Sequence, residues 1–508
     1  MSAAVTPAGT PWRPLKALLG GGVDVPEQFQ VADLTLDSRS VRPGAAFLAC
    51  RGRTRHGLEF APAAVAAGAR AVLWEPAPGV SAPEFAAPVL TVAVPELGAQ
   101  AGFIADRFFG APSARLMVVG VTGTNGKTTC AWLLAAALSA SGRSCAYLGT
   151  LGAGLAGQIV AGTRTTPDAV TVQRQLAQLC EAGAAAVAME VSSHALDQRR
   201  CAGVRFQIAA FTNLSRDHLD YHGDMRAYAA AKGALFDWPT LGARVINVDD
   251  EFGAELATRS APGDLLIVTG SQGDPAQRVP DARFVRAARY THAARGLEID
   301  LATSWGEATL RSALLGDFNV DNLLTVLGVL LASGMALQPA CDVLSACAAP
   351  PGRMQLAGGE GLPLAIVDYA HTPDALDKAL RAARAHCAGK LLCVFGCGGD
   401  RDRGKRAAMG RVAESLADAL YITDDNPRGE DPQRIVADIV AGLRESARAH
   451  VLHDRAAAIA AALATATPGD VVLVAGKGHE DYQLVGAERR AFSDLTQVRS
   501  VLASWGSA

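Results

Sequence analysis

The sequence predicts an α/β protein with about three domains. The chain has 508 residues, and at roughly 150 residues per domain this length gives about three domains. From Arg115 onward, short β-branched runs alternate with glycine-rich or polar loops and with alanine- and leucine-rich helical stretches, a pattern typical of parallel sheets. Hydrophobic residues make up 50% of the chain and charged residues 19%, so several buried cores can form.

The expected strands fall into two series. The first comprises residues 116–121, 185–191, 208–212 and 245–248, and the second, after Pro350, comprises residues 364–367, 391–395, 420–423 and 471–474. The first hundred residues carry short strands between Gly and Pro turns, and residues 108–112 suggest a linker. We therefore predict domains at 1–99, 100–337 and 338–508, with binding sites at the carboxyl ends of the parallel strands.

The charge balance excludes one class of partner. Lys and Arg number 47 and Asp and Glu number 50, which leaves a net charge of -3, so a broad surface for nucleic acid or anionic lipid is not expected.

No apolar stretch is long enough to span a membrane, and the first residues lack the apolar core of a signal peptide. The ten cysteines form no CxxC pair, which favours reduced thiols. We expect a cytoplasmic monomer without a membrane or nucleic-acid partner.

Residues 120–129, GVTGTNGKTT, have the features of a phosphate-binding loop. They follow an expected strand and precede the helical run AWLLAAALSA, so backbone N–H groups and the helix N-terminus would face an anion. Val121 stands where the strict motif has glycine, which makes this loop a variant. The loop predicts ATP binding by Gly123, Thr124, Asn125, Gly126, Lys127, Thr128 and Thr129. The alternatives are a plain glycine turn or a nucleotide-driven switch.

Three further segments resemble one enzyme family. Together with the loop, EVSSH at 190–194, NLSRDHLD at 213–220 and DYAH at 368–371 resemble the ATP-dependent Mur ligases of peptidoglycan synthesis. The resemblance covers nearly the whole chain. It implies an N-terminal domain for a uridine nucleotide, a central P-loop ATPase-like domain and a C-terminal Rossmann-like domain for an incoming amino acid. The implied reaction activates a carboxylate as an acyl phosphate, which an amine then attacks.

The resemblance also implies a metal site. It makes Lys127, Glu190, His218 and Lys232 catalytic, and it makes Thr128, Glu190, His218 and Lys232 ligands of Mg²⁺, with Lys232 carrying a carbamate as N6-carboxylysine. Divalent cations and a lysine would offset the charge of two phosphates and a carboxylate. The alternatives are a solvated strand-end Glu190, an ordinary loop His218 and an exposed helical Lys232.

Two nucleotide sites follow from the same resemblance. Asn319, Asn322 and Arg353 correspond to the ATP site, where an asparagine amide offers a donor and an acceptor to adenine; helix capping is the alternative for the two asparagines. The implied contacts of UDP-MurNAc-L-Ala-D-Glu are Leu36, Ser38, Arg53, Thr54 and Arg55 for the nucleotide, and Thr165, Thr166, Ser192, Gln198 and Arg200 for the peptide end. Loop arginines of this kind are also often merely solvated.

The last implied site distinguishes the amino-acid substrate. Residues 425–428, DNPR, follow an expected strand and resemble the motif of ligases that add meso-diaminopimelate. The guanidinium of Arg428 can bind a carboxylate in a bidentate fork, and lysine lacks the second carboxylate of diaminopimelate. The implied set is Arg401, Asp425, Asn426, Pro427, Arg428, Gly476 and Glu480. The alternatives are the same ligation with L-lysine and an ordinary turn at Asn426-Pro427-Arg428.

Overall fold

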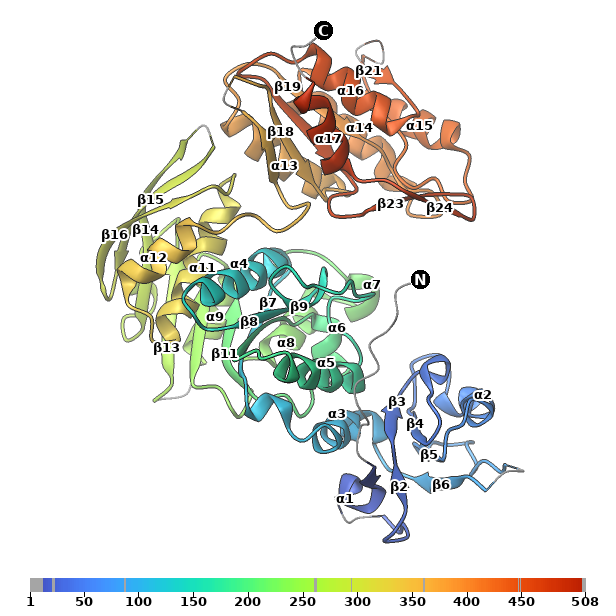
Figure 1. Ribbon diagram of the computed structural model, residues 1–508. Coiled ribbons are helices and arrows are strands. Elements are labelled where there is room, and N and C mark those ends of the chain that lie inside the picture. The colour runs from blue at the N-terminus through green and yellow to red at the C-terminus, as the bar shows by residue number, and fades with distance from the viewer. Residues whose placement is uncertain are drawn as a thin grey trace. The chain divides into compact units, whose positions relative to one another are not determined.

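The computed structural model describes residues 12–20, 23–85, 88–259, 263–293, 295–359, 361–445, 447 and 449–504. The chain forms two compact units, Met1–Ile267 and Val268–Ala508. Parallel strands covered by helices occur in both units (Figure 1), which confirms the predicted α/β class.

The first unit begins with a small parallel sheet. Its strands, in the order β3-β4-β5-β6, are Asp33–Thr35, Ala45–Ala49, Ala71–Trp74 and Leu90–Ala93. The helical segments of this region are α1 (Leu15–Leu19), η1 (Ser38–Ser40), η2 (Gly57–Phe60), α2 (Ala61–Ala66) and α3 (Leu97–Phe108), and β1 (Arg13–Pro14) pairs with β2 (Gln30–Val31). The expected linker at 108–112 begins in α3, because Phe108 is buried as the last residue of this helix.

A second sheet of the first unit has the order β12-β11-β7-β10-β8-β9. Its strands are β7 (Met117–Thr122), β8 (Cys145–Gly149), β9 (Gly152–Leu155), β10 (Ala186–Glu190), β11 (Phe206–Phe211) and β12 (Ala243–Asn247). Its helical segments are η3 (Pro112–Ala114), α4 (Lys127–Ala140), α5 (Ala169–Glu181), α6 (Ser193–Asp197), α7 (Leu219–His222), α8 (Met225–Gly233) and α9 (Glu251–Thr258). The pairs are parallel except β8 with β9, so β7, β10 and β11 end at one edge.

The second unit starts with a part that the sequence did not predict. After β13 (Leu265–Gly270) and α10 (Pro275–Arg278), strands β14 (Arg283–Ala293), β15 (Gly296–Thr303) and β16 (Gly306–Ser312) pair antiparallel. Helices α11 (Phe318–Ala332) and α12 (Leu337–Ser345) follow. These strands alternate exposed and buried residues, so they lack the continuous apolar runs that indicate parallel strands.

The remaining chain forms a six-stranded sheet in the order β17-β18-β22-β19-β20-β21. Its strands are β17 (Gln355–Gly358), β18 (Leu364–Asp368), β19 (Leu391–Phe395), β20 (Ala419–Ile422), β21 (Ala449–Val451) and β22 (Val471–Ala475), and only β17 is antiparallel. Its helices are α13 (Pro373–Ala385), α14 (Gly404–Leu416), α15 (Pro432–Val440), α16 (Arg455–Thr465) and α17 (Asp494–Ala503). A hairpin of β23 (Tyr482–Val485) and β24 (Glu488–Ala491) follows β22.

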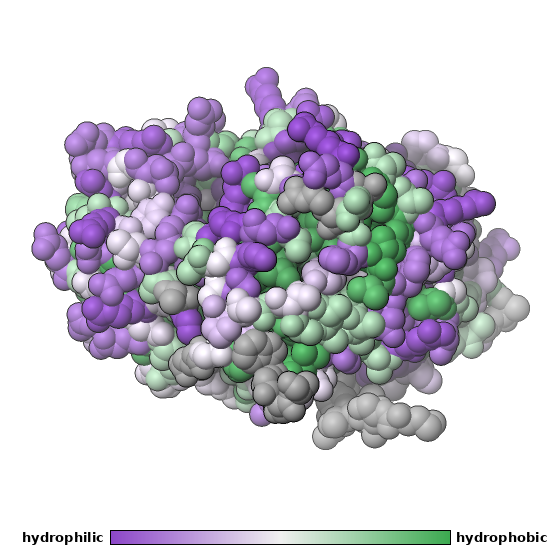
Figure 2. Space-filling model, turned by 90° about the horizontal axis from the view of Figure 1, so that it is seen from above, coloured by the Kyte–Doolittle hydropathy of each residue, from purple (hydrophilic) through white to green (hydrophobic). Residues whose placement is uncertain are grey.

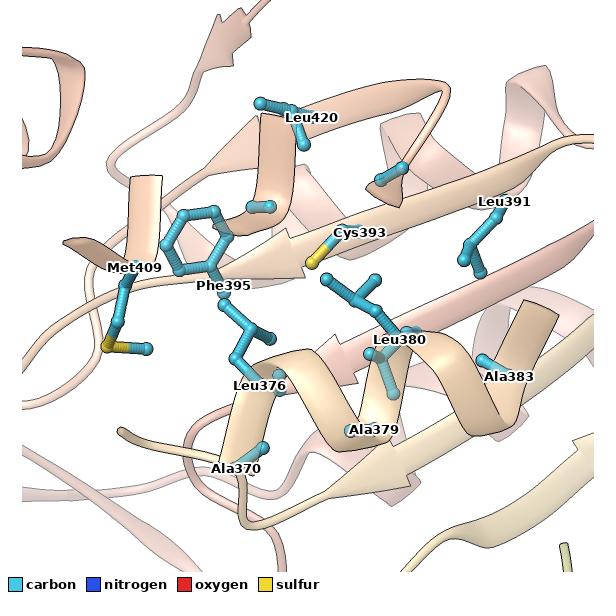
Figure 3. Packing of buried hydrophobic residues seen from close by; sticks show 14 of the residues in the cluster. Ala370, Leu376, Ala379, Leu380, Ala383, Leu391, Cys393, Phe395, Met409 and Leu420 are labelled. Carbon is cyan, nitrogen blue, oxygen red and sulfur yellow. The ribbon is translucent and has the colours of Figure 1, made fainter. Parts of the chain in front are cut away.

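Apolar residues on both faces bury this sheet. Leu376, Ala379, Leu380 and Ala383 recur on α13 at helical spacing and point toward β19 (Figure 3). Along β19 the side chains alternate between this cluster and the one under α16 and α17. Each fully buried leucine contributes about 1.5–3 kcal/mol. Because the strands are apolar throughout, polar side chains gather in the loops at their ends.

Three remaining expectations concern the chain as a whole. No helix in the described ranges is both long and apolar enough to cross a membrane. The face of the molecule seen in Figure 2 carries hydrophobic patches among hydrophilic residues. The ten cysteines all lie in the described ranges, and none is part of a disulfide, as expected. The predicted boundary at 99 lies inside α3, and the one at 337 falls on the first residue of α12. The division into three domains at these two boundaries stays a prediction.

Candidate functional site

The predicted phosphate loop joins β7 to α4 in a preformed conformation. Gly123 has φ 150°, and a Cβ there would lie 1.9 Å from the Thr212 hydroxyl, so the chain requires glycine at this point. The Thr212 Oγ1 donates to the Asn125 carbonyl at 2.6 Å, and the Lys127 ammonium donates to the carbonyls of Gly123 and Thr124 at 2.9 and 2.8 Å. Lys127 therefore lies folded over its own loop at the start of α4.

Glu190 is fully buried at the end of β10, and neutral groups surround its carboxylate. The Tyr147 hydroxyl and the Thr150 amide donate to Oε1, the amide at 2.9 Å. The hydroxyls of Thr128 and Thr150 donate to Oε2 at 2.9 and 3.2 Å. Because these four donors are neutral, none of them competes with a cation for the carboxylate. The alternative of a solvated strand-end group is therefore wrong for Glu190.

The end of β8 makes room for this carboxylate. A Cβ on Gly149 would lie 2.2 Å from Glu190 Oε1 and 2.6 Å from the Tyr147 hydroxyl oxygen. The Tyr147 oxygen also accepts from the Leu151 amide at 3.2 Å, which directs its one proton to Glu190. Glu190 Oε1 is thus fixed by the fold, whereas Oε2 contacts only hydroxyls, which can rotate.

The donor set fits Mg²⁺ in chemistry. The Thr128 hydroxyl and the Glu190 carboxylate place oxygen atoms side by side, and oxygen is the ligand type that Mg²⁺ prefers. His218 lies farther out: its side chain is half-exposed, its Nε2 is 3.4 Å from Asp217 Oδ2, and its ring centroid is 4.8 Å from that of His194. Across the part of the chain that the structure describes, no three His, Cys, Asp or Glu residues are grouped as metal ligands. The four-ligand set stays a prediction.

Lys232 is not the exposed helical lysine of the alternative reading. It is buried on α8, its Nζ donates to the Gly123 carbonyl at 2.7 Å, and the ammonium lies 4.4 Å from the centroid of the Tyr228 ring. Its hydrogen bond in the described ranges thus goes to a neutral carbonyl, and Asp217 acts on it only through space. Burial, and then the nearby charge of Lys127, lower its pKa well below the usual value. A neutral amine is the form that reacts with CO₂.

Aromatic and imidazole rings line the space next to Lys232. The centroid of the His194 ring lies 4.2 Å from that of Tyr221 and 5.4 Å from that of His222, and His222 Nε2 is 3.0 Å from the Ser193 hydroxyl. Burial, followed by the charges of His218 and His222, lowers the pKa of His194 to about 4. His194 is therefore a neutral hydrogen-bonding group at physiological pH.

The predicted contacts of the peptide end form one hydrogen-bonded network. The Thr166 hydroxyl donates to the Glu190 carbonyl at 2.8 Å and accepts from the Ser192 amide at 3.1 Å, and the Thr165 hydroxyl is 3.0 Å from that of Thr150. Arg200 donates to the Thr166 carbonyl at 2.9 Å and to Gln198 Oε1 at 2.6 and 2.9 Å. All five predicted residues thus lie in linked loops beside β10.

The predicted uridine-nucleotide residues are less closely grouped. The Arg53 guanidinium lies 4.3 Å from the centroid of the Tyr221 ring, and Tyr221 accepts from Gln198 at 2.8 Å, so this arginine joins the peptide-end network. Arg55 instead pairs with Glu59 at 2.7 Å on the surface. Ser38 begins η1, whereas Leu36 packs against the apolar core, and Thr54 is exposed.

The predicted adenine-side residues lie in the second unit. Asn319 Nδ2 donates to the Leu315 carbonyl at 2.8 Å, and Asn322 Nδ2 donates to Asn319 Oδ1 at 2.8 Å. Both side chains are buried in the first turns of α11, and neither is its N-cap residue, Asp317. The guanidinium of Arg353 lies 4.9 Å from the centroid of the Tyr369 ring. The capping alternative is wrong, while the adenine role stays a prediction.

The predicted amino-acid site is assembled at the ends of β20 and β22. Asn426 Nδ2 donates to Glu480 Oε2 at 2.8 Å, and the buried Lys477 ammonium donates to the same oxygen at 3.0 Å. A Cβ on Gly476, where φ is 116°, would lie 2.8 Å from Asp425 Oδ2. Burial raises the pKa of Asp425 against the opposing charges of Arg455 and Lys477. The structure thus brings Asp425, Asn426, Gly476 and Glu480 together.

Arg428 belongs to the same loop in a constrained conformation. Its φ is 53°, its Nη1 donates to the Gly399 carbonyl at 2.9 Å, and its backbone amide donates to the Leu484 carbonyl at 3.0 Å. A left-handed non-glycine residue indicates a local constraint of the kind found at binding sites. Pro427 precedes it, with its carbonyl 1.9 Å from where a Gly399 Cβ would lie. Arg401 is exposed in the facing loop.

Sequence reasoning missed several supporting residues. Tyr147 and Thr150 hold Glu190, Lys477 links Asn426 to Glu480, and two buried arginines brace the loops around the amino-acid site. Arg406 pairs with Glu430 and Asp438 at 2.7 and 2.8 Å. Arg455 makes a bidentate pair with Asp494 at 2.7 Å and donates to the Ala475 carbonyl. For Lys477, the sequence offered one indication of a structural role: the lysine stands between two glycines at the end of a strand.

Comparison with known proteins identifies the family. The profile of the Mur ligase middle domain matches residues 121–330, that of the Mur ligase glutamate ligase domain residues 352–478, and that of the Mur ligase family catalytic domain residues 30–102. A relative from Ectopseudomonas mendocina is 51% identical over 94% of this chain and 96% of its own. One from Pseudomonas aeruginosa is 50% identical, with the same coverage. Both relatives are named UDP-N-acetylmuramoyl-L-alanyl-D-glutamate--2,6-diaminopimelate ligase.

Solved structures agree with these relatives. A structure with the same enzyme name is 35% identical and matches with a TM-score of 0.71 over 97% of this chain and 99% of that chain. A MurF ligase from Thermotoga maritima in complex with ADP matches with a TM-score of 0.61 at 16% identity, over 92% of this chain and 96% of that chain, which is a likeness of fold alone. The profiles and the relatives that match nearly end to end show that this chain belongs to the Mur ligase family.

Proposed function

We propose that this protein is the ATP-dependent ligase that joins meso-2,6-diaminopimelate to the D-glutamate γ-carboxylate of UDP-MurNAc-L-Ala-D-Glu. The observation that carries the proposal is the roughly half-identical match to ligases of that name over 94% of the chain. The alignment is long enough to include the phosphate loop, the peptide-end network and the DNPR loop. A switch that hydrolyses ATP without joining substrates would not require the last two.

The reaction proceeds in two steps. The γ-carboxylate oxygen attacks the γ-phosphorus of ATP, the bond to the β-phosphate oxygen breaks, and an acyl phosphate and ADP form. The diaminopimelate amine then attacks the acyl carbon, phosphate leaves, and the nitrogen loses a proton. Lys127 and the amides at the start of α4 neutralise and orient the phosphates. The peptide-end network, in which Thr166 is the buried member, orients the carboxylate.

Mg²⁺ would be held by Thr128 and Glu190, with His218 and carbamylated Lys232 as the further ligands, and would offset the phosphate charge when bound. The neutral donors around Glu190 and the lowered pKa of Lys232 support this assignment. A carbamate at Lys232 would replace a potential cation by an anion beside the phosphate loop. The nucleotide roles of Asn319, Asn322 and Arg353, and the uridine roles of Leu36, Ser38 and residues 53–55, are proposed on the family resemblance.

Arg428 selects diaminopimelate over L-lysine in this proposal. Its backbone is fixed by two hydrogen bonds with the β23 hairpin, and its guanidinium lies in the loop that also carries Asn426. A guanidinium fork can bind the second carboxylate of diaminopimelate, which lysine lacks. Glu480 is hydrogen-bonded to Asn426 of the same loop, and its carboxylate is suited to bind an ammonium group.

The test measures ADP release with each substrate omitted in turn. We expect turnover only when the UDP-MurNAc-dipeptide and the amino acid are both present, and turnover without either acceptor would favour an ATPase switch. Arg428→Ala should raise KM for diaminopimelate about 100-fold, because it removes one partner of a charged pair, while KM for ATP stays unchanged. Arg411→Ala, an exposed arginine on α14, is the matched control. Unchanged diaminopimelate kinetics in Arg428→Ala would contradict the assignment.

A further inference from the structure

Lys477 is a fully buried lysine at the end of β22, in the proposed amino-acid site. Two glycines with positive φ flank it, Gly476 at 116° and Gly478 at 54°. Cβ atoms there would lie 2.8 Å from Asp425 Oδ2 and 2.7 Å from the Tyr369 Cβ. The backbone of this loop is therefore packed against its neighbours on both sides of Lys477, which fixes where the side chain starts.

The ammonium of Lys477 has two hydrogen-bond acceptors and a second carboxylate nearby. It donates to Asn426 Oδ1 at 3.1 Å and to Glu480 Oε2 at 3.0 Å, and it lies 3.6 Å from Asp425 Oδ1. Asn426 Oδ1 also accepts from the Leu484 amide at 2.9 Å. Two donors on one atom identify it as the amide oxygen, so the amide nitrogen must face Glu480, to which it donates at 2.8 Å.

This arrangement divides the two oxygens of Glu480 between different tasks. Oε2 accepts from both Lys477 and Asn426. For Oε1, no hydrogen bond is found in the described part of the chain, and the Glu480 side chain is 17% exposed. One oxygen is therefore held by the protein, and the other is open to a donor from outside.

The charges around Lys477 favour a cation as that donor. Asp425, Glu480 and Asp494 face Lys477 and Arg455 in one cluster. Three carboxyl groups face two basic side chains, which leaves an excess of one acidic group. An ammonium group brought to Glu480 would offset it, while Arg428 in the adjoining loop can meet a carboxylate.

We propose that Lys477 is a positioning residue for the amino-acid substrate: it holds Asn426 and Glu480 so that Glu480 Oε1 receives the substrate ammonium. The inference rests on the proposed function and refines it. Lys477 itself does not touch the substrate in this account. Its effect on diaminopimelate should therefore pass through Glu480.

The experiment is a double-mutant cycle in the full-length enzyme, using Lys477→Met, Glu480→Gln and the double variant. Each single variant should raise KM for diaminopimelate about 30-fold, because a buried polar partner is lost, with KM for ATP and for UDP-MurNAc-dipeptide changed by less than about twofold. Because the two residues act as one unit, the double variant should exceed the larger single effect by less than about threefold. Multiplicative effects, or an equal rise in KM for ATP, would overturn the proposal.

Lys477→Arg covers the case in which the methionine variant fails to fold, as judged by thermal unfolding. Arginine keeps a positive charge at this position. The Lys477→Arg enzyme should therefore bind diaminopimelate with most of the wild-type affinity, although its side chain is longer. A Lys477→Arg enzyme whose KM for diaminopimelate and for ATP change in equal proportion would also overturn the proposal. If the wild-type enzyme does not use diaminopimelate at all, the proposed function fails instead.

Discussion

Two buried lysines, Lys232 in the first unit and Lys477 in the second, stand in opposite surroundings. Lys232 donates to a backbone carbonyl and lies on a tyrosine ring, and the charge of Lys127 is nearby. Lys477 is enclosed by two carboxylates and an amide oxygen. Both lie in loops or helices that meet the carboxyl ends of parallel strands, so their position in the fold is similar.

The difference shows how surroundings assign chemistry to the same side chain. Burial without a carboxylate in contact disfavours the ammonium of Lys232, which Asp217 favours only from a distance, and leaves this side chain suited to react as a neutral amine. Burial with two carboxylates compensates the ammonium and makes Lys477 a fixed hydrogen-bond donor. In our account one lysine becomes an anion beside phosphate, whereas the other remains a cation beside the amino acid.

Replacing Lys232 should have the largest effect. Lys232→Met removes the proposed carbamate, so kcat should fall by roughly a thousandfold, while direct binding of diaminopimelate should stay unchanged. In ¹³C NMR with labelled bicarbonate, the wild-type protein should show a carbamate signal that the variant lacks. The signal should grow as pH rises, because the neutral amine is the reacting form. A carbamate signal of wild-type intensity in the variant would show that Lys232 is not the carbamylated residue, and it would contradict the contrast drawn between the two lysines.

Gly149 provides a test of the Glu190 carboxylate beside Lys232. In Gly149→Ala the new methyl group would displace Glu190 Oε1 or Tyr147, so affinity for Mg²⁺ or Mn²⁺ should fall about 10- to 100-fold, as measured by calorimetry in the presence of nucleotide. Gly242→Ala is the matched control, because the nearest atom to its Cβ, the Gln207 carbonyl oxygen, is 3.8 Å away. Equal metal affinity in both variants would argue against a role for Glu190.

A smaller effect is expected at Tyr147. Tyr147→Phe keeps the ring packed against Trp132 and removes only the hydroxyl that donates to Glu190 Oε1. Metal affinity should drop about tenfold, and KM for diaminopimelate should stay unchanged. If this variant altered the affinity for diaminopimelate instead of the affinity for metal, Tyr147 would not act through the metal site, and the two regions would not be functionally separate.

The smallest effect concerns pH and lies away from both lysines. His386 accepts a hydrogen bond from the Gly316 amide through Nε2 at 3.3 Å, and its Nδ1 is 2.8 Å from the Ala293 carbonyl. Burial lowers the pKa of His386 from its usual value. Below pH of about 6.5 the unfolded chain binds a proton that the native ring excludes. Stability should therefore fall as pH drops through this range, and less so in His386→Gln, as judged by urea midpoints; identical pH slopes would contradict this.

The sequence predicted those features that depend on local pattern. Eight strands, the loop before α4 and the strand-end position of Glu190 follow from apolar runs that end in glycine or polar residues; the eight are β7, β10, β11, β12, β18, β19, β20 and β22. The antiparallel strands β14 to β16 were missed, since their apolar residues alternate with exposed ones. The donors Tyr147 and Thr150 could not be predicted, because the first lies on β8 and the second directly follows it, and the neighbour of β8 in the sheet depends on tertiary structure.

Lys477 shows the same limit in the second unit. Its glycine neighbours indicate a tight loop, but its burial arises only when the loops after β20 and β22 meet. The site residues taken from the family resemblance differ in how closely the structure groups them. The peptide-end residues are joined by hydrogen bonds, and so are Asn426 and Glu480 of the amino-acid set, whereas Arg55 and Arg401 lie at the surface.

The central claim is that this ligase joins diaminopimelate to the UDP-MurNAc-dipeptide. The most direct measurement supplies the enzyme with the dipeptide substrate, ATP, Mg²⁺ and equal concentrations of meso-diaminopimelate and L-lysine, and determines the mass of the product. Our account predicts the diaminopimelate adduct almost alone, with ADP formed in equal amount. A lysine adduct as the main product, or ADP without any adduct, would contradict it.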